Sequence, residues 1–150
     1  MSKPLTNAVT VDMPIGPALD STIRIKQAVT PQGKPSQTHF QPLDEIRDSQ
    51  LVEVRPLTGR THQIRVHLHS IGLPVVGDPL YGTSRRHRLK SMDDEIRYCL
   101  KFFKRQALHA HRLGFVHPRS GIEMEFKSPL PEDYRKLINL LNGERYCQTV

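Results

Sequence analysis

The sequence contains no tryptophan and only two cysteines, Cys99 and Cys147, which stand far apart in no metal-binding or redox spacing. Two isolated cysteines predict free thiols in a reducing compartment, so the cytoplasm is the expected location. No apolar run approaches the length of a membrane span, and the first residues lack the apolar core of a signal peptide. These absences argue against a disulfide scaffold and a membrane protein, and they favour a soluble protein.

The composition fits one domain over residues 1–150 with a modest core, since 37% of the residues are hydrophobic and 25% are charged. There are 22 Lys and Arg against 15 Asp and Glu, which gives a net charge of +7. A basic balance favours a polyanionic partner such as RNA or DNA, but many basic proteins bind neither. Charge alone therefore leaves the partner open.

Apolar alternation predicts short strands in the first third of the chain, at 9–11, 23–26, 36–43 and 51–55. Proline predicts irregular chain at 13–17, and turn residues cluster at 31–35 and around 44–49. The last strand leads into a Thr58-Gly59 turn.

A helix is predicted directly after this turn, with Thr61 as its N-cap and His62 in its first turn. Ile64, Leu68 and Ile71 fall on one face at helical spacing, and Gly72 ends the helix.

The second half of the chain begins with a shaped loop rich in Gly and Pro that ends near Tyr81, followed by a strongly basic stretch over 84–105. That stretch is interpreted either as a solvated loop or as an RNA contact surface, with a short helix near 93–103. A hairpin is expected from strands at 107–116 and 122–126. A final helix to about residue 141 would bury Tyr134, Leu137, Ile138 and Leu141.

Four polar residues crowd the start of the first predicted helix: Arg60, His62, Gln63 and Arg65. Free backbone N–H groups at a helix N-terminus favour anions, so this place is predicted to hold a negatively charged group. The alternatives are a surface ion pair for Arg60 and a purely structural arginine at position 65. The histidine pairs 67/69 and 109/111 lack the ligand set of a zinc site, and no nucleophile elbow occurs.

Longer strings resemble one family. Gly59-Arg60-Thr61-His62-Gln63-Ile64-Arg65-Val66-His67, followed by Gly77-Asp78-x-x-Tyr81-Gly82, is similar to the RluA-type pseudouridine synthases. Further similar strings follow in the same order, at 11–15, 33–38, 108–113, 117–121 and 126–131. The resemblance covers about residues 9–141, with 142–150 as a tail.

The resemblance implies an α+β fold with a mixed, mainly antiparallel β-sheet and flanking helices, forming the C-terminal half of a pseudouridine synthase catalytic domain. It implies isomerisation of uridine to pseudouridine in rRNA or tRNA, with no metal or organic cofactor and with no DNA or membrane partner. A uridine is flipped out of its stack, and an aspartate takes part in covalent catalysis.

In the family, the arginine of the Gln-Ile-Arg segment pairs with that aspartate, which carries over to Arg65. Thr61 and its neighbours Arg60, His62 and Gln63 would contact RNA or the flipped nucleotide. Leu108 would supply apolar wall near the base, with Leu113 as the alternative.

The family carries its aspartate in a His-Arg-Leu-Asp segment, and these 150 residues contain no such string. We therefore expect a truncated domain, marginally stable and inactive alone, with Arg65 facing solvent and Asp78 in a structural role. A separately encoded N-terminal half is an expected partner. The alternatives are a non-catalytic RNA-binding module that keeps the basic cleft and a structural protein that dimerises through an exposed sheet edge.

Overall fold

The computed structural model describes residues 4–46, 49–82, 103 and 105–142. Its elements are strands β1 (Val9–Asp12), β2 (Ile15–Pro17), β3 (Gln27–Val29), β4 (Gln37–Ile46), β5 (Ser49–Pro56), β6 (Arg112–Val116) and β7 (Glu123–Lys127), and helices α1 (Gln63–Ser70) and α4 (Glu132–Leu141). None of the helices in these residues is long and apolar enough to cross a membrane. The predicted α+β class is confirmed, and every strand pair in the described part is antiparallel.

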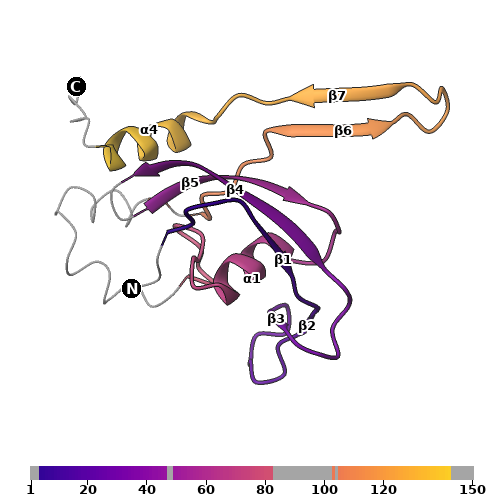
Figure 1. The fold of residues 1–150 in the computed structure, drawn as a ribbon, viewed down its shortest axis with the longest axis vertical. Coiled ribbons are helices and arrows are strands. Elements are labelled where there is room, and N and C mark those ends of the chain that lie inside the picture. The colour runs from indigo at the N-terminus through magenta and orange to yellow at the C-terminus, as the bar shows by residue number, and fades with distance from the viewer. Residues whose placement is uncertain (1–3, 47–48, 83–102, 104, 143–150) are drawn as a thin grey trace.

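The central sheet has the order β1-β4-β5, and α1 covers one of its faces (Figure 1). Val11, Phe40, Leu68 and Val75 form the buried cluster between sheet and helix. Ile64 and Ile71 pack on the same cluster, which confirms the predicted apolar face of the helix. The ladder between β4 and β5 shifts register after Pro42, where proline has no N–H to donate.

The predicted strand over 23–26 is wrong. Lys26 donates its backbone N–H to the carbonyl of Ile23, and Ser21 Oγ accepts from the Ile23 N–H, so local hydrogen bonds turn this segment. Strand β3 follows it and pairs with β2, in a stretch where the prolines predicted irregular chain. Pro17 is tolerated because it ends a three-residue strand, where no further ladder bond is needed. The predicted turn around 44–49 is also displaced, since β4 continues to Ile46.

The C-terminal part consists of a hairpin and a helix. The hairpin β6–β7 projects as an arm from the body (Figure 1). Helix α4 follows β7 and packs against residues Ile46 of β4 and Leu51 of β5. Leu137 and Leu141 are buried as predicted, Tyr134 and Ile138 are half-buried, and Leu140 joins them in a cluster with Ile46 and Phe103. Most of the basic stretch 84–105, including the predicted helix near 93–103, lies outside the described residues.

Candidate functional site

Helix α1 begins differently from the prediction. His62 is the N-cap residue in the left-handed conformation, with φ 57°, and no side chain caps the helix. The predicted Thr61 cap is therefore wrong. Gln63 instead holds the turn that precedes the helix, because its Oε1 accepts from the Arg60 backbone N–H at 3.0 Å and from Thr58 Oγ1 at 2.7 Å.

The other end of the Gln63 amide ties the helix to the sheet. Its Nε2 donates to the carbonyl of Gln37 and to Thr38 Oγ1, both at 2.9 Å. The chain of hydrogen bonds continues from Thr38 Oγ1 to His67 Nδ1 at 2.8 Å, and His67 Nε2 lies 3.0 Å from the carbonyl of Met13. Gln63 and His67 are buried and fully occupied within the chain. The structure thus gives Gln63 a bracing position inside the fold.

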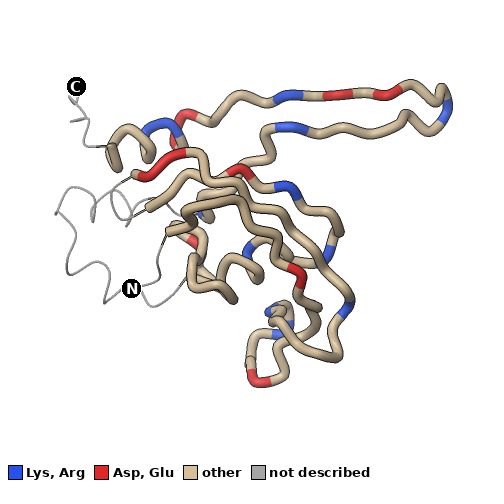
Figure 2. The backbone as a smooth tube through the Cα atoms, in the orientation of Figure 1, with Lys and Arg blue, Asp and Glu red and all other residues tan. Residues whose placement is uncertain are grey.

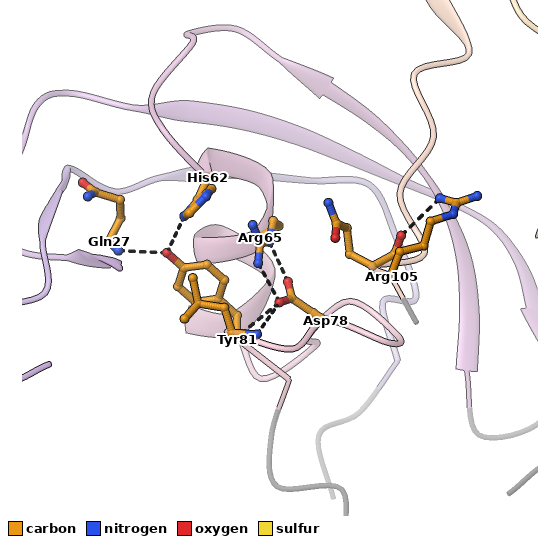
Figure 3. Close-up of polar contacts among 8 residues, drawn as sticks. Gln27, His62, Arg65, Asp78, Tyr81 and Arg105 are labelled. Atoms are coloured by element: carbon orange, nitrogen blue, oxygen red, sulfur yellow. Dashed lines mark hydrogen bonds and ion pairs between the residues drawn. The ribbon is translucent and has the colours of Figure 1, made fainter. Parts of the chain in front are cut away.

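Arg65 does not face solvent without a carboxylate, so that expectation is wrong. Its Nε donates to Asp78 Oδ2 at 2.7 Å and its Nη2 to Asp78 Oδ1 at 2.8 Å, a bidentate pair (Figure 3). The Asp78 side chain is fully buried and that of Arg65 is 13% exposed. This hydrogen bonding raises the pKa of Arg65.

Asp78 is held by its own loop as well. Its Oδ1 accepts from the backbone N–H groups of Leu80 at 2.9 Å and Tyr81 at 3.0 Å. Burial raises the pKa of Asp78, but the hydrogen bonds from Arg65 and from these two N–H groups outweigh it, so its pKa lies below the usual range. Gly77, with φ 73°, makes the turn, and a Cβ there would collide with the carbonyl of Arg105.

Tyr81 joins the site from the same loop and is buried. Its hydroxyl accepts from the Gln27 backbone N–H at 2.8 Å and lies 3.0 Å from His62 Nδ1 (Figure 3). The Arg65 guanidinium sits 4.9 Å from the centre of its ring, in cation–π geometry. Burial and then the charge of Arg65 lower the pKa of His62, which favours a neutral imidazole beside the Tyr81 hydroxyl.

The remaining predicted site residues are Arg60, Thr61, Leu108 and Leu113. Arg60 and Thr61 are exposed, and Arg60 Nε donates to the carbonyl of Pro35 at 3.1 Å. Leu108 is half-buried against the central apolar cluster, and Leu113 lies out on the arm at 59% exposure. The structure therefore brings His62 and Arg65 together, with Arg60 and Thr61 adjoining them in the chain, and it places Leu113 out on the arm.

Sequence reasoning missed the pairing of Asp78 with Arg65 and the whole role of Tyr81. The signal was present, because both residues belong to the Gly-Asp-x-x-Tyr-Gly string that follows the arginine string. The arrangement holds one cation rigidly in a nearly dry site beside a neutral imidazole. Such a cation can orient and stabilise an anionic group brought to it.

Known proteins are similar to this chain. A family model described as RNA pseudouridylate synthase matches residues 2–70. An uncharacterised RNA pseudouridine synthase from Chloroflexus aurantiacus is 47% identical over 132 residues, which are 88% of this chain and 37% of that protein. The ribosomal large subunit pseudouridine synthase D of Escherichia coli K12 is 43% identical over 140 residues, 93% of this chain and 42% of that protein.

The ribosomal large subunit pseudouridine synthase D of Pseudomonas aeruginosa is 42% identical over 142 residues, which are 94% of this chain and 43% of that protein. Among solved structures, human RNA pseudouridylate synthase domain containing 1 aligns with a TM-score of 0.62 and 29% identity, over 87% of this chain and 51% of that one. The chain spans about two fifths of the length of the curated relatives it matches.

Proposed function

Because the chain belongs to the RluA-type family of RNA pseudouridine synthases, we propose that it contributes to the isomerisation of uridine to pseudouridine in RNA. In this reaction the bond between N1 of uracil and C1′ of ribose breaks, and a bond between C5 and C1′ forms. C5 gives up a proton and N1 gains one, so the product is an isomer. An enzymatic carboxylate acts in covalent catalysis as the glycosidic bond is cleaved.

The rigid mounting of Arg65 carries this proposal. Asp78 engages Nε and Nη2, and the Tyr81 ring supports the guanidinium plane. Among the described residues, none of the hydrogen bonds engages Nη1, and we propose that this edge receives the family's catalytic aspartate. An arginine in this position keeps the incoming carboxylate ionised and aimed at the sugar. Asp78 is thus a positioning residue.

The 150 residues contain no His-Arg-Leu-Asp string, so we propose that they need this segment from elsewhere for turnover. The segment would come from an N-terminal half, encoded in the same or a separate chain. Ribosomal RNA is the preferred substrate, because the Escherichia and Pseudomonas relatives are named for the large ribosomal subunit. Transfer RNA is the alternative substrate. The cytoplasmic location stays a prediction.

Tritium release from 5-tritiated uridine in large-subunit rRNA tests the proposal. We expect no release with the chain alone and release after addition of an N-terminal family fragment that carries His-Arg-Leu-Asp. Arg65→Ala should abolish the restored release, whereas Arg55→Ala, in an exposed pair with Glu53, should preserve it. Release by the chain alone would contradict the need for a supplied carboxylate.

A second candidate function is RNA binding without chemistry, favoured by the net charge of +7. Salt-dependent binding of the same RNA, with no release even in the two-part mixture, would support it. If the two-part mixture releases tritium faster from tRNA than from rRNA, tRNA is the substrate of the isomerase.

A further inference from the structure

A cavity of about 400 Å³ lies next to the Arg65 site, between the β2–β3 hairpin and the turn that precedes α1. It is lined by residues 15–17, 27, 32–34 and 59–61. Its volume falls in the range of small-ligand sites, which is about 300–1,000 Å³. The elements around it carry several of the Lys and Arg positions of the body (Figure 2).

The lining of the cavity is basic. No acidic residue is among the lining residues of the described part, whereas Lys34 and Arg60 both line it. The backbone of Lys34 is held by hydrogen bonds with Ile15 in both directions, at 2.8 and 3.0 Å. The Arg60 side chain reaches the same segment, because its Nε donates to the Pro35 carbonyl. Two cations from segments that contact each other suit a phosphate group.

The cavity also carries groups suited to a base. The Gln27 and Gln32 amides each offer a donor and an acceptor, the pairing that a nucleobase edge presents. Gln32 Oε1 accepts from Thr30 Oγ1 at 2.8 Å, which orients that amide. Ile15 and Pro17 add apolar surface for a ring.

Gly59 leaves open space at the rim of the cavity. A Cβ added there would meet nothing within 4 Å, and the residue does not have positive φ. At Gly33, in contrast, an added Cβ would lie 2.5 Å from the backbone of Ile15, so packing requires glycine there. A larger residue at position 59 can therefore be used to narrow the rim.

The cavity shares a wall with the Arg65 site. The backbone of Gln27 donates to the Tyr81 hydroxyl, and that hydroxyl reaches His62, two residues beyond Arg60. We propose that the cavity binds one ribonucleotide of the RNA, a neighbour of the uridine that is isomerised, with its phosphate at Lys34 and Arg60. This proposal rests on the proposed function, since it names the part of the same RNA that this surface takes.

NMR titration of the 150-residue chain with uridine 5′-monophosphate tests it without turnover. We expect saturable shifts of the Gly16, Gly33 and Gly59 amides, with weaker binding of uridine and of inorganic phosphate. Lys34→Gln and Arg60→Gln should each weaken binding about tenfold. Arg119→Gln, which removes the same charge from the turn of the arm, should leave it unchanged.

Gly59→Leu is the steric test, because it should weaken nucleotide binding while the unfolding midpoint stays that of the unchanged chain. Absence of shifts at the three glycines would overturn the proposal, as would equal affinity for inorganic phosphate, which would reduce the cavity to an anion site. Because no reaction is measured, these failures are separate from a failure of tritium release. If uridine 5′-monophosphate binds saturably but the two-part mixture releases no tritium, the nucleotide site stands and the proposed isomerase activity is rejected.

Discussion

At the residue scale, the buried carboxylate of Asp78 decides how Arg65 is presented. We predict that Asp78→Asn destabilises the chain by about 2–4 kcal/mol, because it leaves a nearly buried arginine without its counter-charge. Urea unfolding at neutral pH measures this loss. Asp133→Asn is the matched control, since its pair with Arg105 is exposed on both sides and its loss should cost much less. Equal losses in the two variants would contradict the structural role of Asp78.

The same pair predicts an acid-sensitive part of the stability. The folded-state pKa of Asp78 lies below its ordinary value of 3.8, so the pair contributes fully above that value. The contribution is lost as the pH falls through the lowered pKa, where the folded state must also take up the proton. Urea midpoints from pH 5 downward should therefore fall more steeply for the unchanged chain than for Asp78→Asn. If the urea midpoints of both proteins fall equally with pH, the acid sensitivity does not come from Asp78.

His62 should titrate below its ordinary pKa of 6.5, because burial and the neighbouring guanidinium oppose its protonation. In stability terms, its contribution is complete above 6.5 and decreases as the pH falls from 6.5 toward the lowered pKa. NMR titration of the His62 ring measures this midpoint, and the same ring in the urea-unfolded chain is the reference. A folded-state midpoint at or above the reference would contradict the neutral imidazole at Tyr81.

At the scale of elements, Gln63 joins the start of α1 to the start of β4. Gln63→Met keeps the size of the side chain but removes all four of its hydrogen bonds, to Thr58, Arg60, Gln37 and Thr38. We expect a loss of about 2–4 kcal/mol in the free energy of unfolding, since buried partners lose their bonds. Gln41→Met, on the exposed side of β4, should change it by under about 0.5 kcal/mol. A small loss at Gln63 would mean that water replaces its bonds.

Elements with strong local periodicity could be predicted from the sequence. The helix face of Ile64, Leu68 and Ile71 and the β6–β7 hairpin follow from local pattern and turn residues. Strand β3 could not be predicted in place, because its register depends on β2 and on the turn bonds of Ile23 and Lys26. The string around Arg65 identified the site, but its partner is 13 residues away. Only the three-dimensional turn at Gly77 brings the two together.

At the scale of the whole molecule, the arm stands apart from the body (Figure 1). Leu113, Phe115 and Phe126 share one of its faces and are 59%, 42% and 49% exposed. The two phenylalanine rings stack on each other at 5.9 Å and at an interplanar angle of 14°. A two-stranded hairpin without a covering layer is marginally stable in water. The expectation that the chain is marginally stable stays a prediction.

We therefore predict that amides of β6 and β7 exchange with solvent much faster than those of β4 and β5, because local opening of the arm exposes little buried surface. Hydrogen exchange at several protein concentrations measures this, and the central sheet is the reference in the same sample. Phe126→Ser should leave the urea midpoint unchanged, since its ring lies outside the three apolar clusters found in the described residues. Protection of the arm equal to that of the sheet at every concentration would contradict the prediction. Protection that rises with concentration would mean that a second copy covers the apolar face, as the dimerising alternative requires.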